Sequence, residues 1–294
     1  MEESAARSRL IVYVMAAVAI WGVVLAVGAW RLNRSIVTAL LPAERQDQLV
    51  EQIYTHRTQG RGPKIVAIGG GTGLSMLLRG LKTYSSNLTA VVTVADDGGS
   101  SGKLREELGI APVGDIRNCI VALADAEPTM TELLQYRFPP DRAGEGGLAG
   151  HAFGNLLIAA LLEIAGDFEE GVRLSNRVLA VRGQVVPVAP VPLTLSAELA
   201  DGTQLEGQSR IMRARGVRRV WISPAAVEAS VDAVEAIREA DLIVMGPGSL
   251  YTSLLPSLLV PGIRSALATA TGLRIYVCNV ATQPGETEGY TLSE

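Results

Sequence analysis

The sequence has few of the residues on which several classes of protein depend. Aromatic residues make up 4% of its 294 positions and the net charge is −4, so the chain lacks the basic surface and the stacking side chains of a nucleic-acid-binding protein. Its two cysteines, Cys119 and Cys278, have neither the spacing of a metal site nor that of a disulfide framework. We therefore expect two buried thiols and a partner other than nucleic acid.

Tandem repeats and low-complexity tracts are also lacking, but one long apolar run is present. Residues 10 to 30, LIVYVMAAVAIWGVVLAVGAW, are uncharged and long enough to cross about 30 Å of hydrocarbon. A signal peptide, the alternative, typically has an apolar region of only about 7 to 15 residues followed by a cleavage site. The run predicts a transmembrane anchor over residues 1–34, followed over 35–62 by a juxtamembrane linker helix, for which a homodimer contact is an alternative role.

The charges that flank the apolar run do not set its orientation. Arg7 and Arg9 before it are matched by Arg31 and Arg34 after it. The downstream segment has the pattern of a domain for a cytosolic metabolite. We therefore expect a single-pass protein of the cell membrane with this domain in the cytoplasm.

From residue 63 onward, apolar runs alternate with segments of helical periodicity. KIVAIGG, LTAVVTVAD, DLIVMGPG and LRIYVCNV are typical of buried parallel strands, and residues 74–82, 155–164 and 228–240 have helical spacing. Between them, residues 185–211 contain prolines, an alternating pattern and an ADGTQ turn, which indicate an inserted β-hairpin. The predicted fold class of 63–294 is α/β, with a mostly parallel sheet and helices on both faces.

A glycine-rich loop, GGGTGLS at residues 69–75, follows the first predicted strand and precedes a helix. Glycines let backbone N–H groups approach a phosphate and the helix N-terminus favours an anion, so Gly70, Gly71, Thr72 and Gly73 are candidates for phosphate binding. A tight turn without a ligand is the alternative. No Lys-Ser/Thr pair follows, which excludes a P-loop, and the third glycine of a dinucleotide fingerprint is missing, so NAD binding is a secondary hypothesis.

Two adjacent carboxylates end the second predicted strand. Asp96 and Asp97 would lie beside the glycine loop, because ligands of open α/β sheets bind outside the carboxyl ends of the strands. There they would hydrogen-bond a ribose or hold a divalent ion such as Mg²⁺ through water; an Asx turn with solvated charges is the alternative. The next ligand-binding candidates are Ser100, Ser101 and Lys103.

Three further loops supply the other candidates. One predicted helix begins at GDIRNC. Asp115 there is explained as a helix cap, and the forked guanidinium group of Arg117 suits a phosphate. His151 lies at the start of an apolar helix, where it is either a ligand-facing residue or a core residue. The loop at 245–256 would form a second anion nest, with an aromatic side chain that stacks on the ligand. These loops and the one at 279–291 provide Arg117, Asn118, His151, Asn155, Gly246, Gly248, Ser249, Tyr251, Gln283 and Tyr290.

Over residues 64–294 the chain resembles the YvcK/CofD family, and in particular its YvcK type, the gluconeogenesis factors. The resemblance rests on GGGTGLS, TVADDGGSSGKLR, GDIRNC, LLQYRF, GHAFGNLL, GPGSLYTS and YVCNVATQPGETEGYT. It implies a Rossmann-like core and a ligand site at the strand ends. Members of the YvcK type bind UDP-sugars such as UDP-N-acetylglucosamine and affect cell shape and cell-wall precursor metabolism, whereas the related branch transfers 2-phospho-L-lactate from a nucleotide-linked donor to a deazaflavin.

The function expected from these observations is a non-catalytic, regulatory nucleotide-sugar-binding protein. No Ser/His/Asp or Cys/His arrangement suited to nucleophilic catalysis is evident, and the deazaflavin-site pattern is not found around ADDGGSSGK. A 2-phospho-L-lactate transferase-like enzyme is the alternative. The apolar run at 10–30 departs from the family, and relatives continue past the position of Glu294, which favours a truncated C-terminus.

Overall fold

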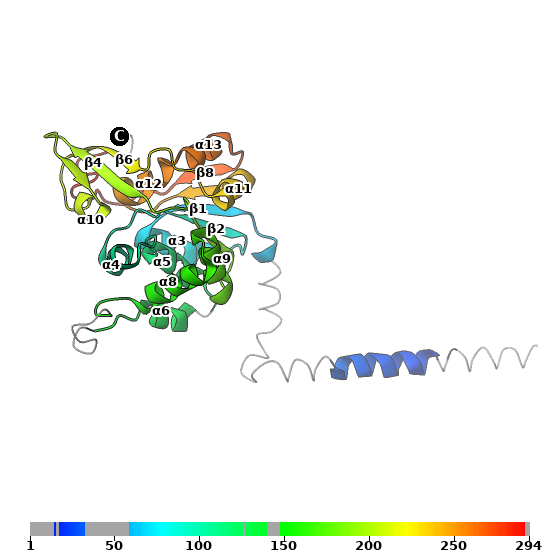
Figure 1. Ribbon diagram of the computed structural model, residues 1–294. Coiled ribbons are helices and arrows are strands. Elements are labelled where there is room, and N and C mark those ends of the chain that lie inside the picture. Colours follow the sequence, from blue (N-terminus) through cyan, green and yellow to red (C-terminus); the bar gives the residue numbers. More distant parts are fainter. Residues whose placement is uncertain (1–14, 16–17, 33–58, 126, 140–147, 292–294) are drawn as a thin grey trace, which may run out of the picture. The chain divides into compact units, whose positions relative to one another are not determined.

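The computed structural model describes residues 15, 18–32, 59–125, 127–139 and 148–291 (Figure 1). The chain divides into two compact units, residues 1–57 and 58–294. In the first unit, residues 18–32 form a helix whose side chains are exposed.

The predicted membrane anchor is not supported. Within the described parts of the chain, no helix combines the length and the apolar character needed to cross a bilayer. The transmembrane helix expected over residues 10–30 is therefore wrong, and so is the cell-membrane localisation that followed from it. Residues 10–14 and 16–17 of that run, and residues 35–58 of the predicted linker helix, lie outside the described residues.

The second unit is built on a parallel sheet of five strands in the order β3-β2-β1-β7-β8. This is the arrangement of the first five strands of a doubly wound, Rossmann-like fold. The four parallel strands expected from apolar runs are present, but β8 is exposed along its length where a buried strand was expected, and β3 is an addition. The strands are β1 Ile65–Gly69, β2 Leu88–Val92, β3 Gln184–Pro187, β7 Leu242–Met245 and β8 Leu273–Tyr276.

Helices cover both faces of this sheet, as its continuous apolar strands require. In Figure 1, α3, α5, α8 and α9 lie on one side of the central strands, and α11 and α13 on the other. The helical segments expected at 74–82, 155–164 and 228–240 are the bodies of α3, α8 and α11. The bounds are α3 Gly71–Leu81, α4 Gly99–Leu108, α5 Gly114–Leu123, α6 Glu127–Gln135, α8 Phe153–Ala165, α9 Phe168–Val178, α11 Val231–Glu239, α12 Leu255–Leu258 and α13 Pro261–Thr269.

The predicted hairpin is present and belongs to a larger insertion. β4 Thr194–Leu199 and β5 Gln204–Glu206 pair antiparallel, and β6 Val217–Ser223 adds a third strand on the other side of β4. A short helix, α10 Gln208–Ile211, connects β5 with β6. Leu195 and Ile211 of this insertion are fully buried in the same hydrophobic cluster as the parallel sheet, so the insertion packs directly against the main fold.

Candidate ligand-binding site

A cavity of about 600 Å³ opens beside the carboxyl ends of β1, β2 and β7. Ligands of doubly wound folds bind at this end of the sheet. Eight of the residues predicted to bind a ligand line it: Gly70, Gly71, Thr72, Gly73, Asp96, Gly248, Ser249 and Gln283. The structure therefore brings the two glycine-rich loops and one acidic residue together.

The glycine loop after β1 has the geometry expected of an anion cradle. Helix α3 begins at Gly71, whose φ is +66°, and its N-cap residue Gly70 makes no side-chain capping hydrogen bond. A Cβ at Gly73 would lie 2.5 Å from the carbonyl oxygen of Pro247, so glycine is required where α3 approaches the second loop. The N-terminus of α3 lines the cavity, and backbone N–H groups of a first helical turn suit a phosphate, although that of Gly71 donates to Asp115.

Two carboxylates share the floor of this cavity. Asp96 lies in the segment between β2 and α4, Asp115 lies in the first turn of α5, and both line the cavity. Burial and the charge of Asp96 raise the pKa of Asp115 to about 7, although the backbone N–H of Gly71 donates to it and Arg117 is near. Burial likewise raises the pKa of Asp96, against hydrogen bonds from Gly98 and Ser101. Without a ligand, this part of the site resists carrying two negative charges.

The sequence predicts Asp115 to be a helix cap, and this prediction is wrong. Helix α5 has no side-chain capping hydrogen bond, and its N-cap position is Val113. The Asp115 side chain instead reaches the glycine loop, where a Cβ at Gly70 would lie 2.6 Å from its Oδ2.

The two residues of the acidic pair have different surroundings. Asp97 does not line the main cavity; its Oδ1 accepts hydrogen bonds from the backbone N–H of Ser209 at 2.8 Å and from the Ser209 hydroxyl at 2.6 Å. Asp97 thus holds α10 of the insertion, while Asp96 faces the cavity. Among the described residues no group of three or more His, Cys, Asp or Glu is arranged to hold a metal ion, so a cation at Asp96 would draw on ligands other than such a cluster.

The second glycine loop is held by the loop after β8. Asn279 donates from Nδ2 to the carbonyl oxygen of Gly248 at 2.9 Å, and Gln283 donates from Nε2 to the hydroxyl of Ser249 at 2.9 Å. A further hydrogen bond of 3.2 Å joins Asn279 Nδ2 to Gln283 Oε1. Both amides belong to the loop after β8, which thus holds Gly248 and Ser249 in the cavity wall.

Several predicted ligand-binding residues lie in a buried polar network instead of the cavity wall. Arg117 donates to Asn155 Oδ1 at 3.0 Å, Asn155 donates to Ser101 Oγ at 3.4 Å, and Ser100 Oγ lies 3.2 Å from His151 Nδ1. Burial, with a smaller effect of Arg137, lowers the pKa of Arg117. Because Ser101 also donates to Asp96, this network supports the acidic floor of the cavity from behind.

The remaining candidates are also outside the main cavity. Lys103 donates to the carbonyl oxygen of Ala149 at 3.3 Å, and Asn118 Oδ1 accepts from Arg117 at 3.0 Å. The hydroxyl groups of Tyr251 and Tyr290 lie 2.8 Å apart, and Tyr251 is buried. Gly246 is likewise absent from the lining. Tyr290 lines an adjoining cavity of about 570 Å³ that shares Gly248 and residues 279–282 with the first.

Sequence reasoning missed the part of the site that comes from the insertion. Gln208 and Met212, on and just after α10, line the main cavity, as does Ser253 after β7. No local motif marks Gln208 or Met212, since their place depends on how the insertion folds back over the sheet. Ser253 lies in the glycine-rich GPGSLYTS segment, so the sequence does carry a signal for it.

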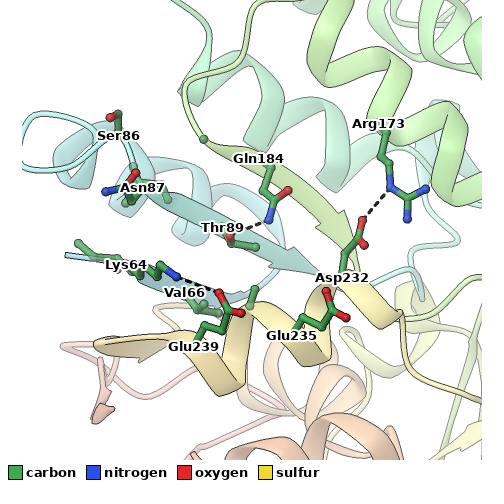
Figure 2. Close-up of a pocket in the computed structure, with 14 residues that line it drawn as sticks. Lys64, Val66, Ser86, Asn87, Thr89, Arg173, Gln184, Asp232, Glu235 and Glu239 are labelled. Atoms are coloured by element: carbon green, nitrogen blue, oxygen red, sulfur yellow. Dashed lines mark hydrogen bonds and ion pairs between the residues drawn. The ribbon is translucent and has the colours of Figure 1, made fainter. Parts of the chain in front are cut away.

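Another cavity, of about 540 Å³, lies at the opposite end of the sheet (Figure 2). It is lined by the amino-terminal residues of β1 and β2 and by α11. Four of its five charged side chains pair with each other: Lys64 with Glu239 at 2.9 Å and Arg173 with Asp232 at 2.8 Å. Its charges are therefore largely satisfied within the protein, and the cavity at the carboxyl ends of the strands is the stronger candidate for the functional site.

Comparison with known proteins agrees with the resemblance inferred from the motifs. The family model described as 2-phospho-L-lactate transferase CofD matches residues 65–294. The chain is 56% identical over 268 residues to the "Putative gluconeogenesis factor" of Nostoc sp., covering 90% of this chain and 58% of that protein. It is 50% identical over 236 residues to the "Gluconeogenesis factor" of Bacillus subtilis, covering 80% of this chain and 73% of that protein.

A solved structure extends the likeness to three dimensions. The X-ray crystal structure of a Bacillus halodurans protein matches with a TM-score of 0.74 and 51% identity, over 79% of this chain and 74% of that one. The chain spans 58% of the length of the Nostoc relative and also of a Clostridium acetobutylicum relative.

Proposed function

This chain belongs to the CofD family, and from that premise we propose that it binds a nucleotide-diphosphate conjugate of the UDP-sugar type, such as UDP-N-acetylglucosamine. The diphosphate lies on the glycine loop at the start of α3 and on the loop at 246–249. Binding serves regulation, and the gluconeogenesis-factor names of the relatives support this role. Control of cell shape and cell-wall precursor metabolism is part of the same proposal.

The observation that carries the proposal is the convergence of two glycine-rich loops on one cavity. Gly73 approaches Pro247 so closely that no side chain fits between them, and both loops contribute to the wall. The backbone groups at these loops suit phosphate oxygens. The adjoining cavity, lined by Tyr276 and Tyr290, gives an extended conjugate room beyond the phosphates.

Calorimetric titration of the 294-residue chain tests the proposal. The ligands are UDP-N-acetylglucosamine, GDP and NAD, each with and without Mg²⁺. In this proposal the Asp96 carboxylate accepts hydrogen bonds from the ribose hydroxyl groups. We therefore expect saturable binding of the UDP-sugar that weakens in Asp96→Asn, whereas the exposed, ion-paired Asp125→Asn control binds as wild type. A preference for NAD, or no binding of any nucleotide conjugate, contradicts the proposal.

The acidic floor of the cavity favours a second candidate function, a 2-phospho-L-lactate transferase-like activity. Asp96 and Asp115 lie beside the loops proposed for the diphosphate, and a divalent ion between carboxylates and phosphates would offset their mutual repulsion. The test is incubation with Mg²⁺, a nucleotide-linked phospholactate donor and a deazaflavin acceptor, with the product followed by mass spectrometry. Intact UDP-sugar binding without any transfer counts against the enzyme.

A further inference from the structure

One polar group in the wall of the main cavity has no role within the protein. Gln208 is 8% exposed and lines the cavity, yet its Oε1 is buried and has no hydrogen-bond partner among the described residues. Buried amide oxygens are nearly always paired, because an acceptor without water or a donor is costly. Because Gln208 lines the cavity and its Oε1 has no partner among the described residues, its carboxamide is a candidate for contact with a bound ligand.

Gln208 is held in place by contacts on both sides of it in the chain. The N–H of Gly207 donates to the carbonyl oxygen of Leu195 at 2.8 Å, and Ser209 donates twice to Asp97. Gly207 has a φ of +101°, and a Cβ there would clash with the Asp97 carboxylate. The backbone that carries Gln208 is thus fixed against the segment that supplies Asp96.

Met212 lies next to Gln208 in the wall of the main cavity. It follows Gln208 by four residues, its N–H donates to the Gln208 carbonyl oxygen at 2.9 Å, and both side chains line the cavity. Met212 is 52% exposed, so its thioether presents an apolar, adaptable surface next to the carboxamide. A flat or ring-shaped ligand group with polar edges suits this combination.

We infer that Gln208 is a specificity-determining residue, whose carboxamide hydrogen-bonds the non-phosphate part of the bound nucleotide conjugate while Met212 packs against its ring. The chemistry recognised is an adjacent donor and acceptor, which a carboxamide complements with Oε1 and Nε2. Two parts of a UDP-sugar offer it, namely the imide edge of uracil and the hydroxyl groups of the sugar. This inference rests on the proposed function of the cavity.

The test is titration of wild type and Gln208→Leu with UDP and with UDP-N-acetylglucosamine. Leucine removes the carboxamide at similar size, leaving the ligand's polar groups unpaired, and we expect affinity to fall by roughly 5- to 100-fold. Gln204→Leu is the matched control, since Gln204 is an exposed glutamine of the same insertion that does not line the cavity. Thermal unfolding of each variant confirms that the insertion remains folded.

Every outcome decides between the alternatives. Equal weakening for UDP and UDP-N-acetylglucosamine assigns Gln208 to the base, and weakening for the UDP-sugar alone assigns it to the sugar. Unchanged affinity for both ligands in Gln208→Leu overturns the inference and leaves the proposed function standing. If wild type binds neither ligand, the proposed function and this inference are both overturned.

Discussion

At the scale of single residues, two aspartates that are adjacent in one motif have different surroundings in the structure. Asp96 is directed to the cavity and Asp97 to Ser209, although they are adjacent in the sequence. A motif-based assignment treats them as one acidic pair. Their separate surroundings predict separate consequences of substitution.

Asp115→Asn is expected to stabilise the protein at neutral and alkaline pH. The folded-state pKa of Asp115 is about 7, above its ordinary value of 3.8, so its favourable contribution is present below about pH 4 and is lost as the pH rises to about 7. Asparagine carries no charge and can still accept from Gly71. We expect the variant to exceed wild type by roughly 2–4 kcal/mol at pH 8 and to match it near pH 4.

Urea unfolding at several pH values measures this difference. Glu235→Gln, which replaces an exposed carboxyl group on α11, serves as the control and should keep the pH dependence of wild type. A stability curve for Asp115→Asn that runs parallel to wild type from pH 4 to pH 8 would show that Asp115 is not held in a charge-destabilising site.

Asp97→Ala is expected to loosen α10 while Asp97→Asn preserves it. Alanine removes the acceptor for the N–H and hydroxyl of Ser209, whereas asparagine keeps an acceptor oxygen in the same place. Hydrogen exchange of residues 207–212 should become roughly 5- to 150-fold faster in the alanine variant. Equal protection in both variants would argue against an anchoring role for this carboxylate.

At the scale of secondary-structure elements, the junction of α3 with the second glycine loop is the tightest point of the site. Gly73→Ala places a Cβ against the backbone of Pro247 and should destabilise the protein by about 1–3 kcal/mol. Gly80→Ala, in the same helix with no atom within 4 Å of the new Cβ, should stabilise it by about 0.5–1 kcal/mol. Paired denaturant titrations measure both, and a Gly73→Ala variant as stable as wild type would contradict the close approach.

The strands show what sequence could and could not predict. β1, β2 and β7 were recognisable because strands buried on both faces need unbroken apolar runs. Most of β3 falls within the stretch whose prolines, alternating pattern and turn predict a hairpin, and β6 carries two adjacent exposed arginines, Arg218 and Arg219. Local pattern alone does not reveal which partner a short strand pairs with.

The candidate site, like the strands, could be predicted from the sequence only in part. The glycine loop and Asp96 were predicted because strand ends of a parallel sheet converge by topology. Gln208 was not, because it approaches the cavity through contacts such as Ser209 with Asp97, whose partners are separated by 112 positions in the sequence. Side-chain direction at Asp97 and Asp115 likewise depends on tertiary packing.

At the scale of the whole molecule, the hydrophobic core formed by the described residues lies in the second unit. Its buried cluster runs from Ile65 to Ala270. Just before it, Gln59 donates from Nε2 to the carbonyl oxygen of Thr83 at 3.0 Å, and its own carbonyl oxygen accepts from the N–H of Ser86 at 3.0 Å. Among the described residues, the contacts of this unit therefore begin at the turn around Gln59 (the Gln59 turn), a few positions ahead of the first strand.

A fragment of residues 58–294 is expected to unfold at the same urea concentration as the 294-residue chain, because every member of the core cluster is retained.

A fragment of residues 63–294 loses the Gln59 turn and leaves the buried edge near Ser85 less covered. We expect it to be less stable by about 1–3 kcal/mol, the usual cost of unpairing buried polar groups. Gln59→Ala in the longer fragment separates the side-chain contacts from the backbone ones, since it removes the bond to Thr83 and keeps the bond from Ser86. Equal urea midpoints for the fragments that begin at 58 and at 63 would show that the fold starts at the first strand.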